Sequence, residues 1–293
     1  MSEFKYLRKN LNDEYGILKL QEKILEIMVY IDEFCEKHNI KYCLMGGSAL
    51  GAARHGGFIP WDDDLDIFMD RKNYLKFIEC CKTDLDNSKF YLQQENTSEQ
   101  PHFFMKLRMN GTTCIDEVQK DNKNMHQGIF VDIMCLNNSA KTEIGKKIQY
   151  YSAGLLKAKT ISKTNYKTDN KKKKIQLFIA KCIVWGPFKC FLLHLVRRYN
   201  EKATKEVAHL FGRAKYRNSF YKTEWFSQLK KIPFENVELY VPCGIDEYLR
   251  VRYGERYMDM PSEETKAIYQ SHAMTWDVEK DYTEYMREDN VKI

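Results

Sequence analysis

The stretch WDDDLDIF (residues 61–68) decides how the rest of the sequence is interpreted. Its second half alternates acidic and apolar residues, which is the pattern of a β-strand with one face in a core. Successive strand side chains point to opposite faces, so Asp64 and Asp66 should project the same way, about 6.5–7 Å apart. Two such carboxylates repel each other unless a cation lies between them, and Mg²⁺ prefers oxygen ligands. A solvated acidic loop is the alternative interpretation.

A third acidic residue, Asp132, stands in the middle of the otherwise apolar stretch IFVDIM (129–134). A buried carboxylate is costly, so this side chain must be neutral, paired with a base or bound to a metal. The alternative to a metal is a salt bridge to a nearby Lys or Arg. A permanent basic partner of this kind would argue against metal binding by Asp132. Asp62 is expected to support the site from the preceding loop, and Asp63 to face away.

The stretch LMGGS (44–48) predicts a strand that ends in two glycines before a helix begins. Glycines let phosphate approach backbone N–H groups, and a helix N-terminus favours anions. Gly46, Gly47 and Ser48 are therefore candidates for holding the phosphates of a nucleotide. A Gly-Gly pair that is merely a turn is the alternative.

Two basic residues, Lys106 and Arg108, alternate with apolar neighbours and should share one strand face. They are candidates for neutralising a diphosphate, and an exposed basic strand face is the alternative. The formal charge of +6 over 293 residues fits an anionic substrate or an anionic membrane surface. It falls short of the basic profile of nucleic-acid binders, so we expect no nucleic-acid partner.

Helical and strand patterns alternate through the first half of the chain and predict a mixed α/β (α+β) fold with a β-sheet flanked by helices. We expect helices at 13–38, 48–54 and 72–82, and strands at 65–69, 90–94, 103–109, 112–117 and 129–134. Asn110-Gly111 predicts a hairpin between two of these strands. The sequence becomes helix-rich from about Ala140, so we divide the chain into a catalytic core (1–138) and a helical region (139–293) that packs on the core and completes the substrate site.

Nine cysteines occur without any CxxC pair, which favours buried, reduced thiols. The N-terminal stretch carries charges where a signal peptide needs an apolar core, so we expect a cytoplasmic protein.

The apolar stretch 175–196 is interrupted by Lys181 and Lys189 and broken by Gly186-Pro187, which argues against a membrane-spanning helix. Two alternatives remain. The stretch is either a helical hairpin packed on the core, or a surface element whose basic flanks contact an anionic membrane from its inner face.

The run GGSALGAARHGGFIPWDDDLDIFM (46–69) resembles the signature of the LicD family, bacterial phosphotransferases of the nucleotidyltransferase-fold superfamily that are distant kin of the fukutin-related proteins. KLRMNGTTC (106–114), GIFVDIMCL (128–136) and VPCGIDEYLRVRYGERYMDMP (241–261) are similar to further family motifs, in the family's order. Met134-Cys135 departs from the aromatic residue and proline that the family more often shows, which we interpret as a packing variation.

The resemblance implies a nucleotidyltransferase-like sheet in which Asp64 and Asp66 hold Mg²⁺, or Mn²⁺, against the donor diphosphate, and Asp132 holds a second ion. It implies that Gly47 and Ser48 hold nucleotide phosphates. The implied reaction moves phosphocholine from CDP-choline to a hydroxyl of a cell-surface glycan, a teichoic-acid precursor or lipopolysaccharide, the acceptor being free or lipid-linked. Alternatives are ribitol or glycerol phosphate from a CDP-polyol, nucleotidyl transfer to a small molecule, and a non-catalytic nucleotide-binding module.

Overall fold

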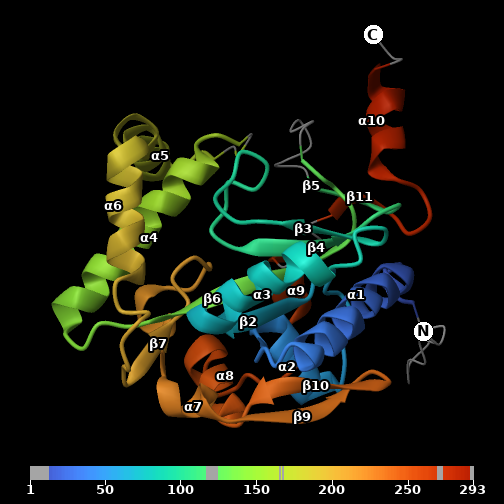
Figure 1. The fold of residues 1–293 in the computed structure, drawn as a ribbon, viewed down its shortest axis with the longest axis horizontal. Helices are drawn as coiled ribbons and strands as arrows, with labels where there is room; N and C mark the ends of the chain where they lie inside the picture. Colours follow the sequence, from blue (N-terminus) through green and yellow to red (C-terminus); the bar gives the residue numbers. More distant parts are fainter. Residues whose placement is uncertain (1–12, 117–124, 165, 167, 269–272, 291–293) are drawn as a thin grey trace.

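The computed structural model describes residues 13–116, 125–164, 166, 168–268 and 273–290 (Figure 1). The helices are α1 (Leu18–Lys37), α2 (Gly46–His55), α3 (Arg71–Asp84), α4 (Glu143–Ile161), α5 (Lys171–Ile183), α6 (Gly186–Arg197), α7 (Thr223–Ser227), α8 (Ile245–Tyr253), α9 (Glu263–Ile268) and α10 (Tyr282–Asn290), with a short 3₁₀ helix η1 (Tyr216–Asn218). The strands are β1 (Cys43–Leu44), β2 (Asp66–Asp70), β3 (Phe90–Gln93), β4 (Met105–Met109), β5 (Thr113–Asp116), β6 (Phe130–Asn138), β7 (Glu206–Ala208), β8 (Phe220–Lys222), β9 (Leu229–Phe234), β10 (Val237–Pro242) and β11 (Ala273–Asp277).

A seven-stranded mixed sheet forms the centre of the molecule, which confirms the predicted fold class. Its strand order is β1-β2-β6-β4-β3, with β7 added to β6 and β8 added to β7. The neighbours β2 and β6 run parallel, and the other pairs are antiparallel. Helices α1, α2 and α3 pack against this sheet (Figure 1). The apolar periodicity of α1 explains its position, because Leu20, Ile24, Met28 and Ile31 are all buried in the core.

The parallel pairing of β2 with β6 fixes the register that matters for function. Asp66 lies directly opposite Asp132, and Ile67 lies opposite Ile133. The alternation of polar and apolar residues makes this register specific, because a slip of one residue would exchange the two faces of the strand. Two acidic residues that are 66 positions apart in the sequence are thereby placed side by side.

The prediction of a hairpin at Asn110-Gly111 is wrong, because β4 and β5 do not pair with each other. Gly111 does turn the chain, with a φ of 70°. However, β4 is already paired with β3 on one side and β6 on the other. The next strand, β5, pairs instead with β11 near the C-terminus. An Asn-Gly pair indicates a tight turn, but it does not specify which strands pair around it.

The second half of the chain contains helices α4, α5 and α6, as expected, but also strands that sequence patterns did not predict. Strand β7 pairs with β6, β11 pairs with β5, and β9 and β10 form a hairpin that lies against β1. In the sheet that contains β6 and in the sheet that contains β5, a strand from before or up to residue 138 therefore pairs with a strand from after it. The division of the chain at that residue stays a prediction.

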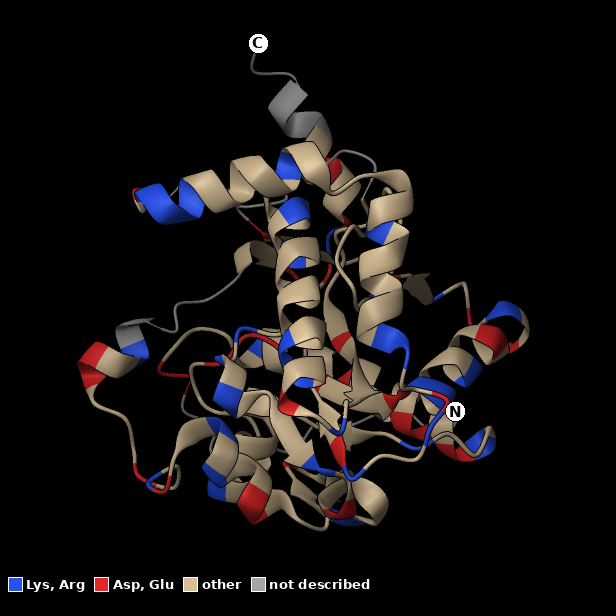
Figure 2. Ribbon diagram, turned by 90° about the vertical axis from the view of Figure 1, so that its left-hand side faces the viewer, with Lys and Arg blue, Asp and Glu red and all other residues tan. Residues whose placement is uncertain are grey.

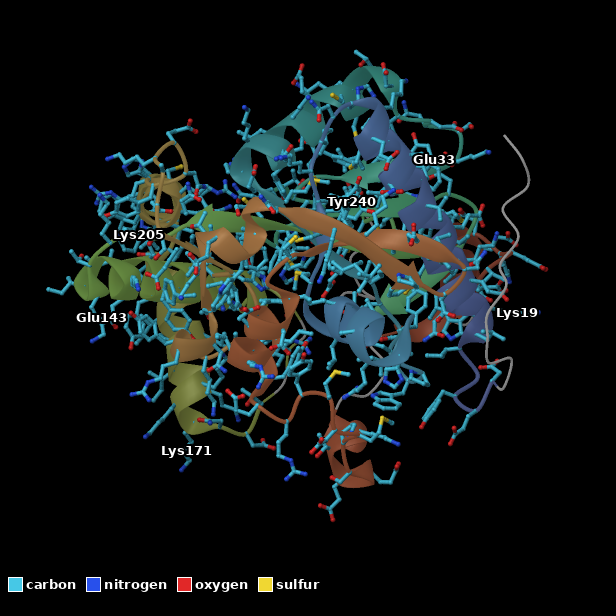
Figure 3. All side chains as sticks on the ribbon, turned by 90° about the horizontal axis from the view of Figure 1, so that it is seen from below. Lys19, Glu33, Glu143, Lys171, Lys205 and Tyr240 are labelled. Atoms are coloured by element: carbon cyan, nitrogen blue, oxygen red, sulfur yellow. The ribbon has the colours of Figure 1, made fainter. Side chains whose placement is uncertain are left out.

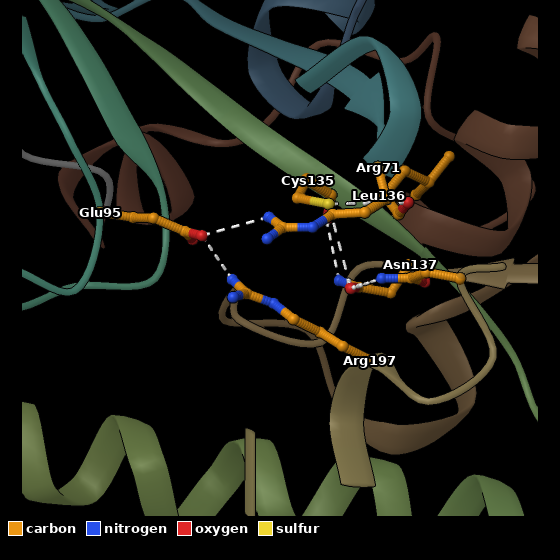
Figure 4. A network of polar contacts seen from close by, with 7 residues as sticks. Arg71, Glu95, Cys135, Leu136, Asn137 and Arg197 are labelled. Atoms are coloured by element: carbon orange, nitrogen blue, oxygen red, sulfur yellow. Dashed lines mark hydrogen bonds and ion pairs between the residues drawn. The ribbon is translucent and has the colours of Figure 1, made fainter. Parts of the chain in front are cut away.

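A partly buried ion-pair network attaches α6 to the core (Figure 4). Oε1 of Glu95, which follows β3, accepts hydrogen bonds from Arg71 at 3.2 Å and from Arg197 at 2.6 Å. Arg71 opens α3 and Arg197 closes α6, so one carboxylate joins three separate segments. All nine cysteines lie in the described part of the chain and are unpaired thiols, as predicted, although Cys182, Cys190 and Cys243 are exposed.

Candidate active site

The loop that carries the acidic run is held by two distant side chains. The Gln21 amide of α1 donates to the carbonyl oxygen of Asp62 at 2.8 Å and to that of Ile59 at 3.2 Å. The Glu235 carboxylate, in the β9–β10 turn, accepts from the Phe58 N–H at 2.9 Å. These bonds fix the direction in which the chain enters β2, and hence the position of its acidic side chains.

Four carboxylates gather where β2 begins. Burial raises the pKa of Asp66 well above its usual range, and the negative charges of Asp64, Asp132 and Asp62 raise it further. The Oδ1 atom of Asp66 is shielded from solvent and has no hydrogen-bond partner among the described residues. The structure thus brings together the three acids that the sequence singled out, with Asp62 beside them. Their mutual repulsion favours a cation at this point.

Asp132 is buried and forms an ion pair with Lys106, whose Nζ lies 2.6 Å from Oδ1. This pair is the alternative that the sequence left open for Asp132. Its presence is confirmed, and it argues against Asp132 as a metal ligand through Oδ1. A carboxylate offers two oxygens and about four acceptor positions, so one ammonium does not exhaust it. Metal binding by Asp132 stays a prediction, in which Oδ2 is the available oxygen.

Lys106 and Arg108 are buried, so the alternative of an exposed basic strand face is wrong. Arg108 donates to Gln93 Oε1 at 2.8 Å and to the Gly128 carbonyl at 2.7 Å. The Lys106 ammonium lies 3.3 Å from the centre of the Phe130 ring. Burial lowers the pKa of Arg108 to about 10 and lowers that of Lys106, which Asp132 partly offsets. Both cations line a pocket next to the acidic strands.

The Gly46-Gly47-Ser48 turn lies directly against the acidic cluster, but part of its hydrogen-bonding capacity is already used. The Gly46 N–H donates to the Tyr248 hydroxyl at 2.8 Å, and Ser48 Oγ accepts the Asp66 N–H at 2.8 Å. A Cβ on Gly47 would lie 2.6 Å from Asp62 Oδ2, closer than real Cβ contacts allow. Gly47 is therefore required for the close approach of Asp62, and phosphate binding by the three residues stays a prediction.

Sequence patterns did not assign Tyr248 and Tyr253 to the site. Both belong to α8, and the Tyr253 hydroxyl would lie 3.7 Å from a Cβ on Gly46. The similarity of 241–261 to a family motif was the signal that could have placed them. Asp63 is buried, and its Oδ2 accepts the Ala273 N–H at 2.9 Å, so it attaches β11 to the loop.

The donor set fits a hard divalent cation that shares its ligands with a substrate. Among the residues that the structure describes, no three acidic, His or Cys side chains are arranged to hold a metal ion by themselves. Mg²⁺ is commonly bound by one or two carboxylates together with water and substrate phosphates. The unpartnered Oδ1 of Asp66 and the repulsion around it are what such an ion would relieve.

Residues 39–144 match the family model described as the LicD/FKTN/FKRP nucleotidyltransferase domain. These residues form a LicD-family domain. A stretch of 55 residues is 49% identical to the lipopolysaccharide cholinephosphotransferase LicD of Haemophilus influenzae. A stretch of 38 residues is 53% identical to the ribitol 5-phosphate transferase FKRP of Homo sapiens, and 54 residues are 43% identical to an uncharacterized protein of Rickettsia typhi.

The LicD-family domain contains all the acidic and basic residues of the candidate site, and the matched stretches are short. They cover 19% of this chain and 21% of the Haemophilus protein, and 13% of this chain and 8% of the human protein. The Rickettsia match covers 18% of each chain. The family model ends at residue 144, before α5, α6 and α8. The similarity therefore concerns the sheet and its acidic strands.

Proposed function

We propose that this chain is a Mg²⁺-dependent phosphotransferase that moves phosphocholine from CDP-choline to a hydroxyl group of a cell-surface glycan or its lipid-linked precursor. The observation that carries the proposal is the pairing of Asp66 with Asp132 on parallel strands, with Asp66 Oδ1 buried and unpartnered among the described residues. The activities for which the Haemophilus and human relatives are named, both transfers of a phosphate-linked group, support the reaction class.

In the proposed reaction, the acceptor oxygen attacks the phosphorus that carries choline. A P–O bond forms to the acceptor, the P–O bond to the bridging oxygen breaks, CMP leaves with that oxygen, and the hydroxyl gives up its proton. Asp64 and Asp66 would hold Mg²⁺, and Asp132 would contribute its free oxygen. When bound, the ion supplies positive charge to the diphosphate and helps align an in-line displacement.

The chain's own residues supply the remaining charge and shape. Lys106 and Arg108 stand in a buried setting, where a cation stabilises developing negative charge more strongly than in water. The start of α2 would receive the nucleotide phosphates, with Gly47 allowing the close approach of Asp62. We place the protein in the cytoplasm, where nucleotide-activated donors are available.

A second candidate donor is CDP-ribitol. The observation in its favour is the 53% identity of 38 residues to the ribitol 5-phosphate transferase FKRP. The proposed metal site and phosphate contacts would be the same, and the difference would lie in the part of the pocket that holds the transferred group. Tyr253, which is partly exposed beside Gly46, is one residue that could contact a choline group through its ring.

The test measures binding and turnover of a panel of donors. The full chain is mixed with Mg²⁺, a glycan acceptor preparation and either CDP-choline, CDP-ribitol, CDP-glycerol or a nucleoside triphosphate, and released nucleotide is measured. Thermal shifts with each donor are recorded in parallel, with and without EDTA. We expect CDP-choline to raise Tm and release CMP, and EDTA to abolish both effects.

Each other outcome changes the proposal in a defined way. Release of CMP from CDP-ribitol but not CDP-choline would replace the donor and keep the chemistry. Release of pyrophosphate from a nucleoside triphosphate would indicate nucleotidyl transfer. Thermal shifts that EDTA does not affect would contradict the metal site, and the absence of any shift or nucleotide release would contradict the enzyme function.

A further inference from the structure

Helix α5 exposes an apolar face. Ile175, Phe178, Ile179 and Ile183 lie at helical spacing on one side, and Phe178 and Ile175 are 69% and 60% exposed. In Figure 2 the lysine-rich end of this helix is blue and most of the remainder is tan. Contiguous exposed apolar surface is uncommon on proteins that act without a partner. We therefore expect this face to bind another molecule or a membrane.

The opposite side of α5 already has its own packing partner. Ala180 and Val184 are buried in a small core together with Leu156 of α4 and Leu192 of α6, and Leu177 packs against it. Helix α5 therefore has apolar residues on both sides, and the hairpin predicted to pack on the core does so with only one of them. The exposed side is not needed to hold the helix in place.

The junction between α5 and α6 adds an exposed aromatic residue. Trp185, which is 64% exposed, precedes Gly186-Pro187, where the chain bends and α6 begins. No single helix in the described ranges is long and apolar enough to cross a membrane, and α5 and α6 qualify only as a pair bent by 113°. Because the inner sides of this pair are packed on α4, the exposed surface is suited to lie along an interface.

The charge of this region has one sign. Between residues 171 and 198 the sequence contains eight basic residues and no acidic residue. Four of them, Lys171–Lys174, form the first turn of α5 and precede its apolar face. A polybasic segment beside an apolar helix face complements an anionic lipid surface better than it complements a nucleic acid or an average protein surface.

A basic pocket lies at the α5–α6 junction. It is open to solvent and is lined by Lys159, Lys163 and Lys189 together with Phe103 and Trp185. The Lys159 ammonium donates to the Lys181 carbonyl at 2.5 Å, which holds it at the edge of α5. The pKa of Lys189 is lowered by burial and by the charges of Lys163 and Lys159, an arrangement that a bound anion would relieve.

We propose that α5 and the α5–α6 junction form a peripheral membrane site for anionic phospholipids. The apolar face of α5 enters the boundary between headgroups and acyl chains, Lys171–Lys174 lie at the headgroup level, and the pocket of Lys159, Lys163 and Lys189 receives a lipid phosphate. This inference does not depend on the proposed reaction, because it concerns binding alone and uses residues outside the acidic site.

The test is flotation of the full chain with vesicles of phosphatidylcholine, with and without phosphatidylglycerol. We expect binding that requires phosphatidylglycerol and weakens as salt is raised. Phe178→Asp should weaken binding at least about tenfold, because it places a charge in the apolar layer. The double variant Lys163→Gln, Lys189→Gln should weaken it about twenty-five-fold, which corresponds to about fivefold for each lysine.

Two matched controls separate the site from general exposure and charge. Ile144→Asp changes an equally exposed apolar residue, 73% exposed, at the far end of α4. Lys19→Gln removes a lysine that lies on the other side of the molecule from Lys171 (Figure 3). Both variants should bind within about twofold of the parent chain, and circular dichroism with a thermal melt checks that every variant is folded.

Tryptophan fluorescence tests the depth of insertion. Emission should shift to the blue when anionic vesicles are added, and Trp185→Phe should abolish most of the shift. Equal binding to both kinds of vesicle, or normal binding by Phe178→Asp, would overturn the proposal. A thermal shift by soluble glycerol phosphate as large as that by anionic vesicles would also overturn it, because the pocket would then be a site for free phosphate.

Discussion

Two polar clusters in this molecule are largely shielded from solvent, and they differ in how their charges are balanced. In one, Oε1 of Glu95 accepts from Arg71 and Arg197, so the acid is matched by two bases from other segments (Figure 4). In the other, Asp66 meets the negative charges of Asp64, Asp132 and Asp62, and Lys106 bonds to Asp132 rather than to Asp66.

This difference in charge balance indicates that the Glu95 cluster is structural and that the Asp66 cluster is a candidate binding site. The Glu95 cluster attaches α6 to the core, so its removal should cost stability and leave the chemistry intact. The Asp66 cluster is unfavourable for the protein alone, because its acids repel one another. An unpartnered oxygen does not distinguish it, since Oε2 of Glu95 also has no hydrogen-bond partner among the described residues. Such excess charge is typical of functional sites. Variants of the Glu95 cluster should therefore lose stability and keep activity, whereas variants of the Asp66 cluster should lose activity and keep stability.

The largest effect is expected for Asp66→Asn. We expect kcat/KM for the proposed transfer to fall about a thousandfold, because the metal loses a ligand worth several kcal/mol of charge stabilisation. The free energy of unfolding without metal should stay constant or rise, since a repelled carboxylate is replaced by an amide. Asp70→Asn, at the exposed end of the same strand where it caps α3, is the matched control and should retain activity. Near-normal Mg²⁺-dependent turnover by Asp66→Asn would remove this residue from the ligand set.

Glu95→Gln should produce the opposite result. The free energy of unfolding, measured by urea denaturation, should fall by about 3 kcal/mol, because two mostly buried guanidinium groups lose their counter-ion. Activity per folded molecule should be unchanged. Glu79→Gln removes one partner of an exposed ion pair with Lys82 and should cost about 0.5 kcal/mol or less. A loss of activity at full stability would place Glu95 in the active site instead.

His209 offers a third buried polar group, one that avoids charge altogether. It is buried, and neither ring nitrogen has a hydrogen-bond partner in the described part of the chain. Burial, followed by the charges of Arg252 and Lys157, lowers its pKa to about 3. The unfolded chain binds this proton near pH 6.5, so stability is complete above that pH and declines as the pH falls towards 3.

We expect the lowered pKa of His209 to reduce the free energy of unfolding by about 2–3 kcal/mol as the pH falls from 7 to 4.5. His209→Gln, which carries no charge at either pH, should remove that part of the acid-side slope in urea denaturation. Part of the slope should remain, because burial also lowers the pKa of His102 and of His126 to about 4. His194→Gln, a substitution at an exposed position of α6, should leave the slope unchanged. An identical slope for His209→Gln would show that protonation of this ring is not linked to unfolding.

The sequence predicted local structure well because local structure follows from local patterns. The strand at 65–69 and the helix at 72–82 appear within one or two residues of β2 and α3, since alternation and helical spacing are properties of neighbouring residues. Strand pairing is not local. The partner of β5 is β11, some 160 residues later, and an Asn-Gly turn contains no information about it.

The same distinction applies to the site. The parity of Asp64 and Asp66 and the apolar surroundings of Asp132 indicated which acids would be costly, and the family resemblance indicated that they would meet. The position of Lys106 could not be inferred from alternation, because a shared strand face can point to solvent or into the protein. It is buried because β4 is an inner strand of the sheet, and that position brings its ammonium to Asp132.

The smallest effect is expected where the acidic cluster meets the glycine turn, for Gly47→Ala. The new Cβ would lie 2.6 Å from Asp62 Oδ2, so this carboxylate must move by several tenths of an ångström. We expect kcat/KM to fall about tenfold, because small displacements of positioned groups are costly for catalysis. The matched control is Gly154→Ala in α4, where a Cβ meets no described atom within 4 Å. That variant should gain about 0.5–1 kcal/mol of stability and keep its activity. If Gly47→Ala remains fully active, Asp62 does not position the site, and the functional acids reduce to those on β2 and β6 and Asp64.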